Sequence, residues 1–84
     1  MHKITDRQIE LLRYLEAYTQ EFYCSPTYRE IAERFGWASP QASLGHLRSL
    51  TRKRCVTPIV GANGVSRGYR LTPEGQRLLL DISA

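Results

Sequence analysis

Two helix starts separated by a glycine constrain the fold of this chain more than any other feature of its sequence. Thr27 followed by Glu30 forms a capping-box pattern, and Ser39-Pro40 marks a second start, because serine can cap and proline fits the first helical position. Gly36 is a natural left-handed stop between them. The spacing predicts a short helix, a turn over residues 36–38 and a helix from the proline to about residue 53, which is typical of a helix-turn-helix.

A longer helix precedes this pair. Thr5 and Gln8 form another capping-box pattern, which starts a predicted helix from about Asp6 to Phe22. Its expected buried stripe comprises Ile9, Leu12, Leu15, Tyr18 and Phe22, widened by Leu11.

Two strands and a last helix are predicted after residue 54. Residues 55–60 favour a strand, which Pro58 restricts to an edge or a bulge. Residues 61–68 form a turn-rich tip and residues 69–71 resume the strand, so the two strands make a hairpin, or wing. Thr72-Pro73 starts a helix over about residues 73–82. The predicted fold class is mainly α with a small β-hairpin: one winged helix-turn-helix domain over residues 1–84, in the order helix, helix, helix, hairpin, helix.

Length and charge restrict the functions open to such a fold. With 84 residues, the chain can bury one modest core but has little room for a deep enclosed cleft. Its formal net charge is +4, and seven arginine or lysine residues but no acidic ones lie between Glu33 and Glu74. Such a stretch is the electrostatic footprint of a protein that binds a polyanion, although a solvated basic face is the simpler alternative.

The sequence gives little support for a membrane protein, a disulfide-rich protein, a metal-binding protein or an enzyme. No apolar run approaches the roughly 18 residues of a membrane helix, and two cysteines make no disulfide scaffold, so a cytoplasmic location is expected. Cys24, Cys55, His2 and His46 match no zinc-site spacing, and no metal or other cofactor is expected. No nucleophile–base set or close carboxylate pair is present, so the chain is not expected to be an enzyme.

The helix after the turn presents two different faces. At about 100° per residue, Ser43, Leu47 and Leu50 lie on the core side. The opposite side carries a polar and basic stripe, which consists of Gln41, Gly45, Arg48 and Arg52. Such a helix fits the major groove, where Gln41 can pair with adenine and Arg48 with guanine or a phosphate. The predicted base-reading residues are Ser39, Gln41, Ala42, Leu44, Gly45 and Arg48.

Two of these residues have structural explanations as well. Gly45 costs the helix about 0.5–1 kcal/mol relative to alanine. Either the helix backbone approaches DNA closely there, or the glycine is a tolerated weakness. Leu44 can touch a thymine methyl group, but an apolar residue at the edge of the core is the commoner case.

A second set of residues is expected at the DNA backbone or on the wing. The N-terminus of the helix after Thr27 suits a phosphate, although Tyr28 shares the spacing of that helix's buried face. Arg67, near the wing tip, can enter the minor groove or clamp the backbone, or stay solvated. His46 is more commonly packed or solvated than a phosphate contact. The predicted set is Tyr28, Arg29, His46, Arg52, Lys53, Asn63 and Arg67.

Several blocks of this sequence resemble the DNA-binding domain of LexA-type SOS repressors. The resemblance covers residues 4–71 and is carried by residues 25–43, His46-Leu47-Arg48-Ser49-Leu50, Arg52-Lys53 and residues 66–71. It implies a winged-helix operator-binding protein that acts as a homodimer at a pseudo-palindromic site and reads bases with its third helix.

The sequence departs from that family at specific positions. LexA-type repressors carry a C-terminal autoprotease domain with a Ser–Lys dyad, whereas the only lysines here are Lys3 and Lys53, so self-cleavage is not carried over. Many members have Asn at position 41 and an acidic pair at positions 44 and 45, so a different operator is expected here. Arg54 replaces the usual glycine, and the wing is longer. A free-standing regulator, encoded by a phage or mobile element, is the expected context.

The last helix and the function leave alternatives open. Leu79 and Leu80 are predicted to form a two-fold dimer contact. Packing of these leucines within the domain is an equal alternative. The leading hypothesis is a sequence-specific regulator of transcription that binds double-stranded DNA, more readily a repressor than an activator. The alternatives are a winged-helix protein-interaction or antirepressor module that uses the Leu-rich last helix, and an excised domain of a larger protein. No membrane or small-molecule partner is expected.

Overall fold

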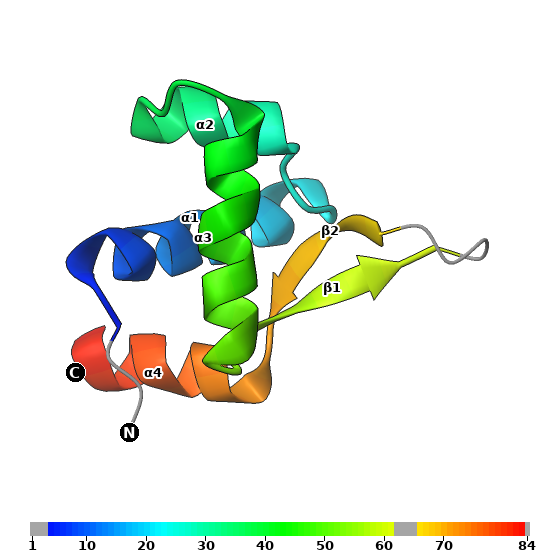
Figure 1. Cartoon of the computed structure of the whole chain (residues 1–84). Helices are drawn as coiled ribbons and strands as arrows, with labels where there is room; N and C mark the ends of the chain where they lie inside the picture. Colours follow the sequence, from blue (N-terminus) through cyan, green and yellow to red (C-terminus); the bar gives the residue numbers. More distant parts are fainter. Residues whose placement is uncertain (1–3, 62–65, 84) are drawn as a thin grey trace.

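Four helices and a two-stranded hairpin follow one another in the predicted order. The computed structural model describes residues 4–61 and 66–83. Its elements are α1 (Asp6–Phe22), α2 (Tyr28–Phe35), α3 (Pro40–Arg52), β1 (Val56–Val60), β2 (Ser66–Leu71) and α4 (Pro73–Ser83). In Figure 1, α3 runs down the front of the molecule, α4 lies at its lower end and the hairpin extends to the right. The winged helix-turn-helix architecture is confirmed.

The helix boundaries follow from their caps. Both predicted capping boxes are formed: the Gln8 N–H donates to Thr5 Oγ1 at 3.1 Å and the Glu30 N–H to Thr27 Oγ1 at 3.0 Å. Gly36 ends α2 with a φ of 71°, which only glycine adopts without steric cost. Ser39 occupies the N-cap position of α3, but its side chain makes no capping hydrogen bond, so that part of the prediction is wrong. The proline at the start of α3 has no N–H to satisfy, which lessens the need for a capping side chain.

The core lies where α1, α2, α3 and the hairpin meet. Its buried apolar residues are Leu11, Leu12, Leu15, Ile31, Phe35, Leu47, Leu50, Cys55, Val56, Tyr69 and Leu71. In the predicted stripe of α1, Leu11, Leu12 and Leu15 are buried, whereas Ile9 and Tyr18 are only half-buried. The prediction was wrong for Phe22, which is 54% exposed. Gln8 lies inside instead, at 5% exposure, since its amide has hydrogen-bond partners there.

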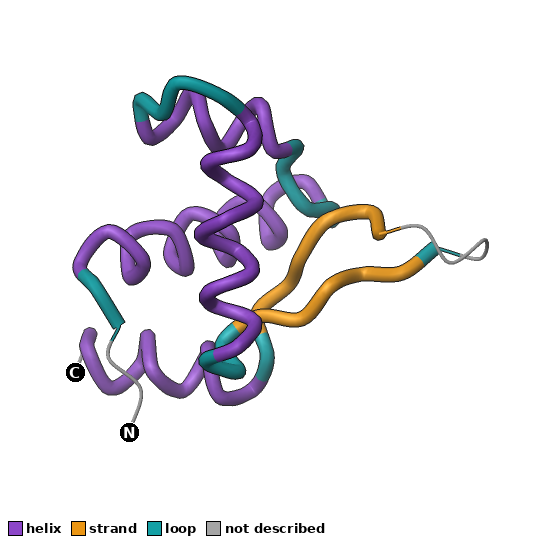
Figure 2. Tube along the Cα trace, viewed as in Figure 1, coloured by secondary structure: helices purple, strands orange, loops and turns teal. Residues whose placement is uncertain are grey.

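The wing is an antiparallel pair whose register runs from Val56 opposite Leu71 to Val60 opposite Ser66. β2 begins at Ser66, so the predicted turn-rich tip over residues 61–68 was too long by three residues. The loop between α1 and α2 lies against β2 (Figure 2), and the Tyr69 N–H donates to Ser25 Oγ at 3.2 Å. A hydrogen bond between these two segments therefore sets where the wing leaves the body of the domain.

Two backbone features connect α3 and the wing to α4. Arg54 has a φ of 63°, the left-handed conformation for which glycine is favoured, so it takes over the role of the glycine that the family pattern has there. The Thr72 hydroxyl donates to the Arg54 carbonyl at 2.6 Å and accepts the Gly75 N–H at 3.1 Å, which starts α4. This helix ends at Ser83, one residue beyond the predicted range.

Candidate nucleic-acid interface

The two faces of α3 separate as the sequence predicts. Ser43, Leu47 and Leu50 are at most 1% exposed. The opposite stripe is exposed along its whole length, from Gln41 and Gly45 to Arg48 and Arg52. The Ser43 hydroxyl donates to the Tyr28 carbonyl at 2.9 Å, which attaches the beginning of α3 to the beginning of α2. The stripe is therefore presented on a helix whose inner face is packed into the core.

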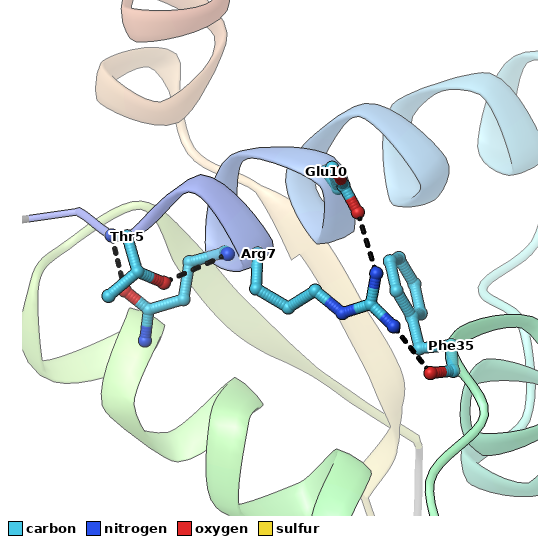
Figure 3. A network of polar contacts seen from close by, with 5 residues as sticks. Thr5, Arg7, Glu10 and Phe35 are labelled. Carbon is cyan, nitrogen blue, oxygen red and sulfur yellow. Dashed lines mark hydrogen bonds and ion pairs between the residues drawn. The ribbon is translucent and has the colours of Figure 1, made fainter.

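Arg7 of α1 stabilises the turn between α2 and α3. One guanidinium nitrogen donates to the Phe35 carbonyl at 2.5 Å, and the other pairs with Glu10 at 2.9 Å (Figure 3). The guanidinium carbon also lies 4.9 Å from the centre of the Phe35 ring, in cation–π distance. A positive group thus meets the carbonyl of the last residue of α2, where the helix dipole favours it. Local sequence patterns do not predict this role, because residue 7 lies 28 positions from residue 35.

Aromatic stacking continues from α2 into α3. The Phe35 and Trp37 rings lie 5.0 Å apart at 19°, and the Trp37 and His46 rings lie 4.3 Å apart at 7°. The three rings bridge the turn, so they couple the end of α2 to the middle of α3. The imidazole of His46, a predicted backbone contact, is half-buried in this stack rather than freely solvated.

A polar network joins the beginning of α1 to the end of α3. Lys53 Nζ donates to Gln8 Oε1 at 2.8 Å, and Gln8 Nε2 donates to Ser49 Oγ at 3.1 Å. Lys53 is half-buried, but an ammonium has three donors and this contact uses one of them. Next to this network, Ala42, Gly45, His46, Ser49 and Gln8 line an open hollow of ≈ 340 Å³. Gln8, which local sequence patterns identify only as a cap residue, therefore also binds side chains at the end of α3.

The remaining predicted DNA-contacting residues differ in exposure. Gly45 has open space around it, since a Cβ built there meets nothing within 4 Å. Leu44 and Tyr28 are half-buried and pack against the core, which agrees with the alternative that these two residues serve packing. Arg29 is exposed, while Ser39 and Ala42 are half-buried. Asn63 lies outside the described residues, and so does the side chain of Arg67.

The perturbed pKa values belong to groups that are hydrogen-bonded or buried within the domain. The Tyr18 hydroxyl donates to Glu30 at 2.9 Å, which raises the pKa of Tyr18 to about 12. The backbone hydrogen bond from Thr27, followed by the bond from Tyr18, lowers the pKa of the Glu30 carboxyl. Burial raises the pKa of the Cys55 thiol. In the described part of the chain, no group of three or more His, Cys, Asp or Glu residues is placed to hold a metal ion.

The last helix has one packed and one open side. Leu78 and Leu79 are partly buried against the core, whereas Leu80 is 70% exposed. Of the two predicted dimer-contact residues, Leu80 is the more accessible and Leu79 the more engaged within the domain. None of the helices in residues 4–61 and 66–83 combines the length and apolar character that crossing a membrane requires.

Comparisons with known proteins agree with this architecture. The family model described as the LexA DNA binding domain matches residues 1–68. A LexA repressor of Shewanella piezotolerans is 39% identical over 74 residues, which cover 88% of this chain and 34% of that protein. The LexA repressor of Pseudomonas aeruginosa strain PAO1 is 38% identical over 71 residues, 84% of this chain and 33% of that protein. The chain thus spans about a third of the length of these relatives.

Solved structures give the same fold. A crystal structure of the S. aureus MepR–DNA complex superposes with a TM-score of 0.76 at 27% identity, over 95% of this chain and 56% of that one. A mutant MepR from a multidrug-resistant S. aureus clinical isolate gives 0.75 at 28% identity, over 96% of this chain and 56% of that one.

Proposed function

This chain belongs to the LexA DNA-binding domain family, and we propose that it binds a specific sequence of double-stranded DNA and represses transcription from it. The observation that carries the proposal is the exposed polar and basic stripe of α3 in a helix-turn-helix. The two relatives above are LexA repressors, and one of the superposed structures is a protein–DNA complex. We propose that the protein acts in the cytoplasm, on DNA there.

The chemistry of the stripe suits the major groove. Gln41 lies at the N-terminal part of α3, which meets the base edges in such complexes, and its amide matches adenine N6 and N7. Arg48 follows two turns later and suits guanine O6 and N7 or a phosphate. Arg52 lies farther along, where phosphates are the expected partner. Base contacts would supply the specificity and phosphate contacts the affinity.

We further propose that two copies of the protein bind one symmetric DNA site. Two copies related by a two-fold axis would read a pseudo-palindrome, with half-sites about 34–36 Å apart or a multiple of that distance. Selection of bound duplexes from a random pool, followed by titration of the selected and a random duplex, tests this directly. We expect the selected duplex to bind at least about a thousandfold more tightly. Equal binding of both duplexes would remove the claim of sequence specificity.

Variants of α3 test the residue assignments. Arg52→Ala should weaken binding to all duplexes alike and reduce the slope of log affinity against log salt by about 0.9. Gln41→Ala should lower affinity mainly for the selected sequence, because only base contacts distinguish sequences. Arg13→Ala, at an exposed position on α1, is the matched control and should change neither. If the protein is instead a protein-interaction module, Arg48→Ala combined with Arg52→Ala leaves its activity intact.

A further inference from the structure

The exposed side of α4 combines apolar and charged residues in a particular order. Leu80 is 70% exposed. Arg77 and Asp81, both exposed, stand four residues apart on either side of Leu80. The family model ends at residue 68, before α4 begins.

A hollow adjoins this side of the helix. Glu16 and Gln20 of α1, together with Gln76, Leu79 and Leu80 of α4, line an open space of ≈ 330 Å³. Part of its lining is apolar and part is amide or carboxylate. The hollow can therefore receive an apolar side chain from outside while its polar rim stays hydrated.

The charge order of α4 is self-complementary. In an antiparallel pair of identical helices whose two-fold axis passes at Leu79, Arg77 of one copy comes opposite Asp81 of the other, and the converse pair forms by symmetry. A second copy of this chain thus offers both the apolar side chain for the hollow and the opposite charge at each end. No other partner is specified by these residues.

We propose that α4 is the surface through which two copies of this chain associate on DNA. Leu80 of each copy packs beside the hollow of its partner, and two Arg77–Asp81 ion pairs flank the contact. In Figure 1, α4 lies at the end of the molecule away from the turn between α2 and α3, so the interface lies away from the N-terminal part of α3. The role on DNA rests on the proposed function, whereas the association itself does not.

The size of this surface determines when the pair forms. One helix of 11 residues offers much less than the roughly 800 Å² per partner of a standard interface, so the pair is weak in free solution. Two copies on neighbouring half-sites experience each other at an effective concentration of about millimolar, which favours the contact. We therefore expect cooperative binding, with at least about tenfold tighter binding per site on a duplex with two half-sites than on one with a single half-site.

Charge reversal tests the arrangement without relying on loss of fold. Arg77→Asp and Asp81→Arg should each abolish the cooperative gain, because each brings like charges together across the two-fold axis. The double variant, and an equimolar mixture of the two single variants, should recover it, since opposite charges then face each other again. Glu74→Arg, a charge reversal in the first turn of the same helix, is the control and should remain cooperative.

The readouts are titrations on both duplexes and sedimentation of the free protein at millimolar concentration. Binding to the single half-site should be unchanged in every α4 variant. Single variants that stay cooperative, a mixture that does not recover, or a wild-type protein that neither self-associates nor binds cooperatively would each overturn the inference. Self-association in sedimentation without binding to any duplex would support this inference and refute the proposed DNA-binding function.

Discussion

Replacing Gly45 by alanine should stabilise the fold and weaken DNA binding at the same time. Gly45 lies in the middle of α3, and an added Cβ meets nothing within 4 Å, so alanine brings no clash. Alanine should then recover about 0.5–1 kcal/mol of the backbone entropy that glycine costs a helix. For a domain of this size, 1 kcal/mol corresponds to about 4–8 °C, so Tm should rise by about 2–8 °C.

The effect on DNA binding should have the opposite sign. If the backbone of α3 approaches the groove at Gly45, the new methyl group holds the helix away and disturbs the base contacts of its neighbours. Loss of one good base contact costs about 1–3 kcal/mol, which is about 5- to 150-fold in affinity. A stabilised protein that binds more weakly cannot be explained by partial unfolding.

Thermal unfolding and duplex titration measure the two effects, with Gly75→Ala as the contrasting variant. A Cβ at Gly75 would overlap the carbonyl oxygen of Cys55, so the same substitution should lower Tm there. A lower Tm for Gly45→Ala would mean that the glycine serves packing within the protein. Unchanged affinity for the selected duplex would mean that this face of α3 does not approach DNA closely, and either result refutes the reasoning.

Three further predictions concern the contacts that hold the helix-turn-helix. Thr27→Ala removes the N-cap of α2 and should lower the free energy of unfolding by about 0.5–2 kcal/mol in urea titrations, whereas Thr27→Ser should retain most of it. The pKa of Glu30 is lowered in the fold, so its ionised form contributes stability above its ordinary value of 4.5, and this contribution is lost as the pH falls through the lower folded value. The difference in Tm between the wild type and Glu30→Gln should therefore shrink as the pH is lowered, and a constant difference would contradict the assignment. Arg7→Ala removes the donor to the Phe35 carbonyl and should cost about 1 kcal/mol and change the fluorescence of Trp37, the only tryptophan, while an unchanged spectrum would show that the turn does not depend on it.

Local rules explain why so much of the helix-turn-helix is predictable. A capping box joins residues three apart, so Thr5 and Thr27 could be identified without any knowledge of the fold. The buried and exposed faces of α3 follow from helical periodicity alone, because residues on a helix turn by a constant angle. The strand boundary at Ser66 was less predictable, since pairing with β1 extends β2 through residues that favour turns.

Local sequence patterns did not predict the contacts between residues that lie far apart in the sequence. The capping-box pattern identifies Gln8 as a cap residue, yet its amide also forms hydrogen bonds with Ser49 and Lys53, which lie 41 and 45 positions away. Lys53 was predicted to contact a phosphate, yet its ammonium also donates a hydrogen bond to Gln8. Such contacts depend on the crossing of α1 and α3, which no local propensity specifies.

The amino-acid sequence by itself determined the order of the elements, the face of α3 that turns outward and the basic stretch that accompanies it, because caps and periodicity act between near neighbours. Only the tertiary structure decided that Arg7 stabilises the turn, that Trp37 stacks on His46, that open space surrounds Gly45 and that Leu80 stays exposed while Leu79 packs. Each of these depends on which surfaces the helices bring together, and that is set by the packing of the whole core.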